Sequence, residues 1–248
     1  MTNLKFIISY LGYGYNGWAK QINNEKTIQQ TIENELSNVF NTKIQIYSSG
    51  RTDKFVHANN QVFSCKINEL KIPLVNLKEL LNKKLIKNNI FIKSIEIVNN
   101  DFNARFSAIS KTYKYLINVG EFNLLENDLI NQFNQKLNIK RMKIASKLFL
   151  GKHNFLSFST SELENTIREI NWIKIIKHKN IIEIYINANG FLRSMVRMLV
   201  AAMMNYSQDK INLDQIQSLL DNPRKGASIE KAKACGLYLE KVYYENDK

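Results

Sequence analysis

The sequence predicts an α+β fold with a mainly antiparallel mixed sheet and flanking helices. Some short segments carry the residues typical of strands, such as "KFIISY" at residues 5–10. Others repeat apolar residues at helix spacing, such as "LVNLKELLNKKL" at residues 74–85. The two kinds of segment follow one another without the regular spacing of βαβ units, which favours antiparallel pairing.

The individual elements follow from the same patterns. The first helix begins at Thr27, where Thr-Ile-Gln-Gln resembles a capping box and a stripe of apolar residues follows. Further helices are expected at residues 74–85, near 141–149, at 190–205 and at 212–221. Strands are expected at residues 5–10, 43–49, 61–67, 90–98, 112–119, 170–178, 181–188 and 237–244. The 248 residues suffice for two modest domains, and we expect lobes of residues 1–107 and 108–248.

The charge of the chain indicates a polyanionic partner. Its 35 lysines and arginines exceed its 22 acidic residues, which gives a formal net charge of +13. Because binding to a phosphate backbone releases condensed counterions, a basic surface favours nucleic acid. A lysine-rich composition without any partner is the alternative. Only seven of the basic residues are arginine, which indicates positions where a planar, bidentate donor is needed.

The sequence argues against a metal site, a disulfide and a membrane segment. Cys65 and Cys235 lack metal-ligand spacing, and we expect both to be small core residues. The histidines are scattered, at His57, His153 and His178. The apolar N-terminal run is too short to span a bilayer and has no cleavage site, so we expect a cytoplasmic protein with no membrane partner.

The segment "SSGRTDKFVHA" at residues 48–58 carries the first candidate for chemistry. We expect it to form a loop between two strands, a common position for catalytic residues. Asp53 follows Arg51 by two residues, and a nearby positive charge favours the ionised carboxylate, which can act as a base or nucleophile. Alternatively, Asp53 forms an Asx turn and hydrogen-bonds only its own loop.

The segment "NGFLRSMVRMLVAAMM" at residues 189–204 places two arginines in an apolar run. Arg193 and Arg197 are four residues apart, so we expect both on one face of a helix. A buried arginine is costly unless it is paired, and Asp53 is a candidate partner. A structural pair with another acidic residue is the alternative.

Aromatic and basic residues are interleaved in "DFNARFSAISKTYKYLI" at residues 101–117. Arg105, Phe106 and Tyr113, with their neighbouring lysines, suit stacking on a nucleobase beside its phosphates. Phe and Tyr at this spacing are also common core residues. In "GKHNFLSF" at residues 151–158, we expect His153 to hydrogen-bond its loop rather than to act as a general base.

Taken together, these motifs resemble the TruA family of tRNA pseudouridine synthases. The resemblance runs through "YLGYGYNGWAKQ", "TIQQTIENEL", "GRTDKFVHA", "FNARFSAISKTYKY", "GKHNFLSF", "NGFLRSMVRMLV" and "GLYLEKVYY". It implies two related α/β lobes with an RNA-binding cleft between them, usually in a homodimer, with neither metal nor cofactor and with no DNA partner. It also implies isomerisation of uridine to pseudouridine at positions 38–40, in the anticodon arm of tRNA.

The resemblance also implies a role for each residue that matches a motif. Asp53 would be the catalytic aspartate, Arg51 would help to displace the target base, and Arg197 would pair with Asp53. Tyr113 would stack against the uracil, and Leu237 would form an apolar wall. Attack of the aspartate on C1′, attack on C6 and a glycal route with a tyrosine base all stay open. The remaining candidates for RNA contact are Arg105 and Arg193.

Several departures from the family pattern bear on the substrate. The chain has "YLG", "GWA" and "RTDKFVHA" where members usually have "YDG", "GWQ" and "RTDAGVHA", and it lacks the usual proline before the final strand. Lys54 and Phe55 add charge and bulk directly after Asp53, where a small, glycine-containing loop is expected. Two alternatives therefore stay open: the same chemistry on another RNA such as ribosomal RNA, or a non-catalytic RNA-binding protein.

Overall fold

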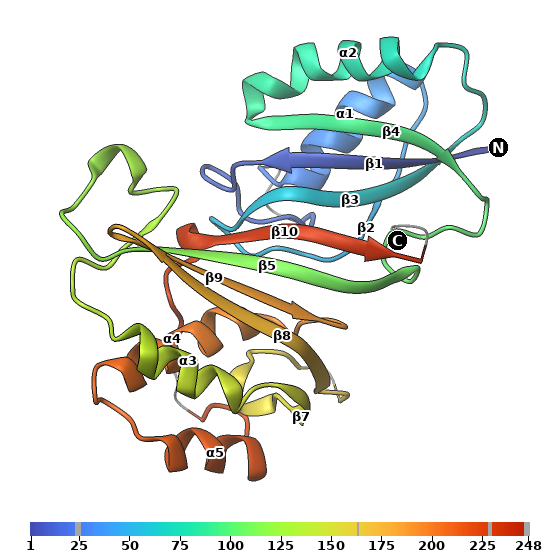
Figure 1. Ribbon diagram of the computed structural model, residues 1–248. Helices are drawn as coiled ribbons and strands as arrows, with labels where there is room; N and C mark the ends of the chain where they lie inside the picture. The colour runs from blue at the N-terminus through green and yellow to red at the C-terminus, as the bar shows by residue number, and fades with distance from the viewer. Residues whose placement is uncertain (23–25, 163, 228–229, 246–248) are drawn as a thin grey trace. The chain divides into compact units, whose positions relative to one another are not determined.

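The computed structural model describes residues 1–22, 26–162, 164–227 and 230–245 (Figure 1). The chain forms two compact units, each with its own strands and helices. One unit comprises Met1–Ile109 together with the chain from Leu239 onward, and the other comprises Ser110–Tyr238. The chain therefore leaves the first unit after Ile109 and returns to it at the end, whereas the sequence placed the boundary between residues 107 and 108.

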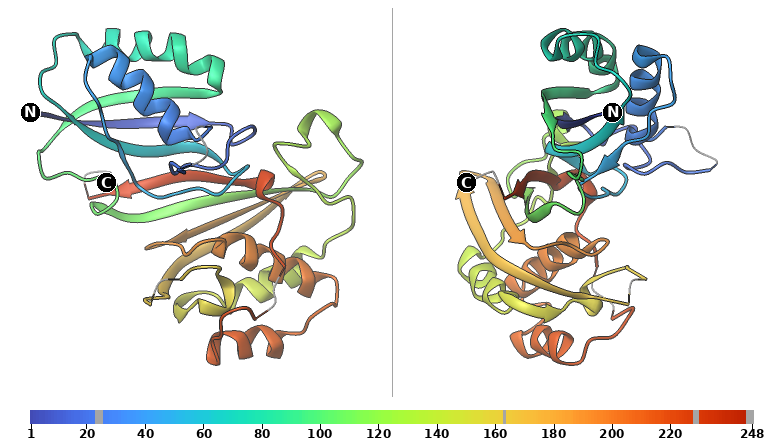
Figure 2. Two further views of the ribbon diagram at one scale, coloured as in Figure 1. Left: turned by 180° about the vertical axis from the view of Figure 1, so that it is seen from behind. Right: turned by 90° about the vertical axis from the view of Figure 1, so that its right-hand side faces the viewer.

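The first unit is a mainly antiparallel sheet with two helices (Figures 1 and 2). Strand β1 (Thr2–Tyr10) lies between β3 (His57–Ile67) and β4 (Ile90–Val98) and pairs antiparallel with both. The short β2 (Tyr47–Ser48) pairs with β3, and the closing strand is β10 (Leu237–Tyr244). The helices are α1 (Ile28–Phe40) and α2 (Leu74–Leu85), which contact one another.

The core of the first unit follows from the apolar pattern of β1 and α1. Phe6 on β1 is fully buried and stacks on Phe63 of β3 with ring centroids 4.5 Å apart. The predicted cap at Thr27 is confirmed, because its side chain accepts the Gln30 N–H at 3.3 Å. The Gln30 side chain instead donates to Asn34 at 2.6 Å. The cap fixes where α1 begins.

The second unit has the same mixture of elements. Strand β9 (Ile181–Ala188) lies between β5 (Ala108–Asn118) and β8 (Ile167–His178) and pairs antiparallel with both. The short β7 (Gly151–Asn154) pairs with β8, and β6 (Asn131–Gln132) pairs in parallel with β5. The helices are α3 (Ile139–Lys147), α4 (Met195–Ser207) and α5 (Leu213–Asp221).

These observations confirm the predicted α+β class and most of its elements, with differences in detail. Within the described residues, no helix is both long and apolar enough to cross a membrane. The expected strand at residues 43–49 is reduced to Tyr47–Ser48. The prediction that Arg193 and Arg197 share a helix face is wrong, because α4 begins only at Met195 and Ser194 before it is left-handed, with φ of 63°. Arg193 therefore lies in the preceding turn.

Candidate active site

The loop that carries Asp53 is anchored at its start by Gln61 of β3. Gln61 is fully buried, and its Oε1 accepts the Ser49 hydroxyl at 2.7 Å. Its Nε2 donates to the Gly50 carbonyl at 2.9 Å, and the Ser49 N–H donates to the Val62 carbonyl at 2.8 Å. A buried amide that makes both kinds of hydrogen bond fixes the loop more firmly than solvent-exposed contacts would.

Thr52 holds the middle of the loop. Its side-chain oxygen shares a buried hydrogen bond of 2.8 Å with the Tyr10 hydroxyl, and its carbonyl accepts the Trp18 N–H at 3.0 Å. Burial raises the pKa of Tyr10 above its ordinary value, which favours the neutral phenol in this bond. Both partners of Thr52 are themselves buried core residues, so the backbone directly before Asp53 has a fixed position.

Asp53 is the first residue of a tight turn. The Val56 N–H donates to the Asp53 carbonyl at 3.2 Å, which closes the turn over Lys54 and Phe55. Phe55, the third residue, has φ of 65°. A positive φ at this position is typical of glycine or asparagine in a type II turn, and it costs other residues about 1–2 kcal/mol. The turn thus holds a bulky residue in a conformation that its backbone disfavours.

The glycine-rich segment at residues 11–18 packs directly against this turn. A Cβ on Gly12 would lie 2.2 Å from the Val56 carbonyl oxygen, and a Cβ on Gly17 would lie 2.9 Å from the Thr52 carbonyl oxygen. The Gly12 N–H donates to Nδ1 of the buried His57 at 3.0 Å, so a neutral His57 ring carries its proton on Nε2. His57 therefore belongs to the scaffold of the loop.

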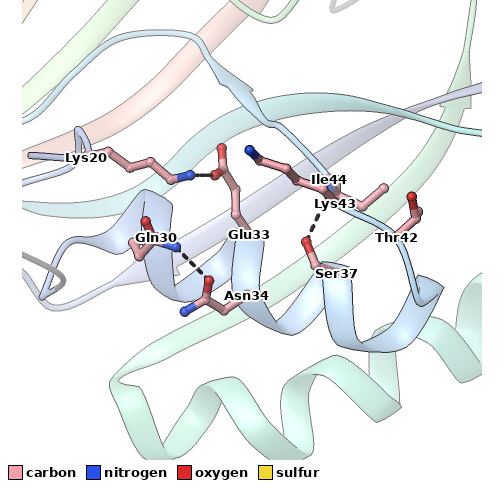
Figure 3. A pocket seen from close by; sticks show the side chains of 8 residues that line it. All are labelled: Lys20, Gln30, Glu33, Asn34, Ser37, Thr42, Lys43 and Ile44. Atoms are coloured by element: carbon pink, nitrogen blue, oxygen red, sulfur yellow. Dashed lines mark hydrogen bonds and ion pairs between the residues drawn. The ribbon is translucent and has the colours of Figure 1, made fainter. Parts of the chain in front are cut away.

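A pocket of about 440 Å³ lies beside α1, and Figure 3 labels the eight side chains that line it. Lys20 points towards Glu33 and forms an ion pair with its carboxylate. Glu33 is 3% exposed, and it also accepts the Gln29 side-chain amide at 2.9 Å and the Ile46 N–H at 3.0 Å. Because Lys20 follows Trp18 by two residues, this cluster secures the segment that holds Thr52 and has a structural role.

We expect Glu33→Gln to destabilise the protein by about 1–3 kcal/mol. The Glu33 carboxylate accepts from three donors, and the NH2 group of a glutamine would face one of these donors and leave it unsatisfied. Thermal unfolding followed by circular dichroism should show a lower Tm, by about 2–4 °C for each kcal/mol. The matched control is Glu79→Gln on the exposed surface of α2, which should change stability by less than about 0.5 kcal/mol. Equal Tm values for the two variants would contradict the structural role.

The two other sequence candidates in this unit, Arg51 and Arg105, are both exposed. Arg51 lies within the anchored loop, two residues before Asp53. Arg105 lies in a loop whose Ala104 N–H donates to the Ser64 hydroxyl of β3 at 3.2 Å, and its guanidinium stacks 5.4 Å from the Phe106 ring. Ser64 is seven residues beyond the start of β3, so at ~3.3 Å per residue Arg105 lies roughly 20 Å from the Asp53 turn.

In the second unit, Tyr113 of β5 is buried and meets Phe191 edge-on, with ring centroids 5.0 Å apart. Tyr115, two residues along the same strand, donates its hydroxyl to the Lys233 carbonyl at 2.7 Å. Alternate residues on a strand share a face, so both tyrosines belong to the same side of the sheet. The segment that precedes β10 is thus attached to the face that carries Tyr113.

The same segment also holds Arg197. The Arg197 Nε donates to the Ala232 carbonyl at 2.7 Å, and the Ala232 N–H donates to the Arg197 carbonyl at 3.2 Å. Arg193 is exposed, and its carbonyl accepts the Thr160 N–H at 3.0 Å. Arg197 is therefore fixed by two bonds, and Arg193 lies at the surface in the turn before α4.

Leu237 begins β10 and is 6% exposed, which fits an apolar wall. Gly236 before it has no room for a side chain, because a Cβ there would lie 2.7 Å from the Leu116 carbonyl oxygen. Three of the sequence candidates therefore lie in one part of the second unit, namely Tyr113, Arg197 and Leu237. They are connected through Phe191 and through the segment that carries Ala232 and Lys233.

Other candidates have ordinary structural surroundings. His153 hydrogen-bonds the Leu150 carbonyl at 2.8 Å, as predicted for a loop residue. Cys65 is a buried core residue, and burial raises its thiol pKa to about 12. Cys235 is also a free cysteine, and it is half-buried. Among the residues that the structure describes, no group of three or more His, Cys, Asp or Glu side chains could hold a metal ion.

Comparisons with known proteins identify the family of this chain. Residues 6–107 and 145–245 match the family model described as tRNA pseudouridine synthase. The chain belongs to this family. The matched ranges contain most of the candidate residues, namely Arg51, Asp53, Arg105, Arg193, Arg197 and Leu237. Tyr113 lies between the two ranges.

Individual relatives extend the match to nearly the whole chain. The protein is 46% identical over 241 residues to tRNA pseudouridine synthase A of Malacoplasma penetrans, covering 97% of this chain and 99% of the relative. It is 43% identical over 242 residues to the protein of that name from Mycoplasma genitalium, covering 96% and 97%. The TruA resemblance is confirmed, and the chain is a tRNA pseudouridine synthase, an isomerase.

The structure places Asp53 in a loop between two strands, as the sequence predicted, whereas the residues that hold this loop were not predicted. Gln61, Thr52 and Tyr10 act through buried hydrogen bonds between segments far apart in the chain. The glycines of "LGYGYNGW" were the one available signal, because Gly12 and Gly17 lie where other backbone passes too close for a side chain.

Proposed function

We propose that this enzyme isomerises uridine to pseudouridine at positions 38–40, in the anticodon stem-loop of tRNA, with Asp53 as its catalytic aspartate. The observation that carries the catalytic assignment is the turn itself. Asp53 occupies the first position of a turn whose preceding residue is held by Tyr10 and Trp18 and whose far side rests on Gly12. Such a rigid loop can hold a reactive group within the small tolerance that catalysis requires.

The reaction needs a carboxylate and an enclosed base, and the product contains the same atoms as the substrate. The C1′–N1 bond breaks, the uracil turns, and a C1′–C5 bond forms. The proton lost from C5 is balanced by the proton gained at N1, so substrate and product are isomers. Asp53 supplies the carboxylate that assists cleavage of the first bond, and walls around the detached base prevent its loss to solvent.

In this proposal the walls and the positive charge come from three further residues that match motifs of the family. We assign Tyr113 to stacking against the uracil and Leu237 to an apolar wall. Arg197 is the ionic partner of Asp53 in this proposal. It is the third residue of α4, where a positive charge opposes the helix dipole at a cost of about 0.3–1 kcal/mol. Its two bonds with Ala232 keep it there, and an arginine at a helix N-terminus suits an anionic partner.

The exposed arginines bind RNA in this proposal. Arg51 lies close enough in sequence to Asp53 to help displace the target base from its stack. Arg193 and Arg105 bind phosphates, and the roughly 20 Å between Arg105 and the turn assigns Arg105 to a part of the tRNA distant from the target nucleotide. We also propose that the enzyme is a homodimer in the cytoplasm and that it requires no metal or cofactor.

The test is to incubate the purified protein with unmodified tRNA and, separately, with unmodified ribosomal RNA, and to map pseudouridine at single-nucleotide resolution. We expect signal at positions 38–40 of tRNA. Pseudouridine found only in ribosomal RNA would show that ribosomal RNA, and not the tRNA anticodon stem-loop, is the substrate. Tight binding of both RNAs without any pseudouridine would overturn the proposed activity.

The net charge of +13 predicts a steep dependence of tRNA binding on salt. Each neutralised phosphate should reduce the affinity by roughly tenfold for a tenfold increase in salt. Measuring the dissociation constant by fluorescence anisotropy at several salt concentrations gives this slope. Arg193→Gln should lower the slope by about one, whereas the same substitution at Arg141, whose guanidinium stacks on Tyr206, should leave it unchanged. A flat response would show that the lysines form only a solvated surface.

A further inference from the structure

The turn after Asp53 contains a residue that neither packing nor backbone preference explains. Phe55 occupies the third position of the turn with φ of 65°, where glycine is favoured, and its side chain is 38% exposed. The next residue, Val56, is 2% exposed and already anchors the turn in the core. An outlying backbone conformation next to a reactive group is reason to look for a function.

Charge around the Phe55 ring favours an anionic, aromatic partner. Lys54 Nζ lies 5.1 Å from the ring centroid, and Arg51 is exposed in the same loop. A partly exposed aromatic ring with basic residues in the same loop is an arrangement with which proteins stack on unpaired nucleobases while binding their phosphates. Nucleic acid fits these groups better than a purely apolar partner, which would leave the cations without a role.

Distance links the ring to the nucleotides next to the target. The first and last Cα atoms of a tight turn lie within about 7 Å of each other, so the Phe55 backbone is also close to that of Asp53. Neighbouring bases stacked along one strand lie roughly 3–4 Å apart. A uridine that reaches Asp53 therefore leaves a neighbouring base within reach of Phe55. Flipping the target also removes a stacking partner from that neighbour.

We propose that Phe55 is a substrate-binding residue that stacks on the base adjacent to the flipped uridine and replaces the stacking lost on flipping. The inference rests on the proposed function of Asp53. The strained conformation persists because a glycine would relieve the strain but could not provide the ring. Lys54 holds one side of the ring and binds the phosphate of the same nucleotide.

The test compares Phe55→Gly, Phe55→Ala and Phe55→Trp. The glycine variant fits the backbone without strain, so it should be more stable than the alanine variant, and both lack the ring. Loss of stacking should weaken binding of an unmodified tRNA transcript by roughly 5- to 100-fold in both, while the tryptophan variant retains affinity. Because stacking is not an ionic contact, the dependence of affinity on salt should not change.

Several outcomes would overturn the proposal. If the Phe55 ring had only a structural role, tRNA binding would follow the stability of each variant. Recovery of tRNA binding in the glycine variant but not in the alanine variant would therefore refute stacking. Unchanged affinity in both variants would do so as well. Asn41→Gly is the matched control for strain, since Asn41 has φ of 50° at the end of α1, and it should leave tRNA binding unaffected.

The catalytic assignment is tested separately by Asp53→Asn. Failure of that assignment would appear as pseudouridine formed by the asparagine variant, whatever Phe55 does. Failure of the stacking role would appear as unchanged tRNA affinity in the Phe55 variants while Asp53 remains essential.

Discussion

Replacing Asp53 by asparagine should lower the rate of pseudouridine formation by at least about 1,000-fold while tRNA binding is largely retained. Asparagine has nearly the same shape and can occupy the same turn, because the Asp53 backbone carbonyl accepts the hydrogen bond that closes it. It lacks the negative charge that assists cleavage of the bond between sugar and base. Single-turnover assays with an unmodified tRNA transcript would measure the rate, and anisotropy would measure binding.

The matched control is Asp101→Asn, which removes a negative charge from an exposed loop in the same unit and should leave the rate within a few-fold. Pseudouridine formed at an unchanged rate by Asp53→Asn would show that Asp53 only stabilises its loop, as in an Asx turn. Loss of both binding and thermal stability would point to the same conclusion, since a catalytic carboxylate should be separable from the fold.

Much of this fold could be predicted because its signals are local. The helix at Leu74–Leu85 and the strand at Ile181–Ala188 have the predicted bounds, since apolar spacing and flanking turn residues determine each of them. Helix α4 begins five residues later than predicted. Buried Leu192 lies before the start of the helix and extends its apolar pattern backwards, and the left-handed backbone of Ser194 that delays the helix has no glycine to signal it.

The site was less predictable because it depends on contacts between distant segments. Asp53 and Arg51 stand together in a short motif, so the sequence indicated them directly. Phe55 could be recognised as unusual for its position, but its φ of 65° depends on how Val56 and Gly12 pack. Gln61 has no local signal, since its hydrogen bonds join residues that are 11 and 12 positions apart.

Gly12→Ala should lower the turnover rate by about 100-fold without an equal loss of tRNA binding. A methyl group at this position would lie 2.2 Å from the Val56 carbonyl oxygen, 2.7 Å from the Val56 carbonyl carbon and 2.9 Å from the Phe55 carbonyl carbon. All three are backbone atoms that cannot rotate away, so the turn must move by roughly 1 Å. A displacement of that size at a reacting group can cost about two powers of ten in rate.

Gly14→Ala in the same segment separates this displacement from a general loss of stability. Gly14 has φ of 79°, so a side chain there is strained, at a cost of about 1–2 kcal/mol, but its Cβ would meet only the end of the Lys26 side chain at 3.8 Å. The Asp53 turn therefore stays in place, and turnover should remain within a few-fold of the original rate despite a lower Tm. Equal turnover in the two variants would mean that Gly12 matters only for folding. A loss of turnover confined to Gly12→Ala would show that catalysis depends on the exact position of the Asp53 turn. That position is set by the contact between two loops, one on either side of α1 in the sequence.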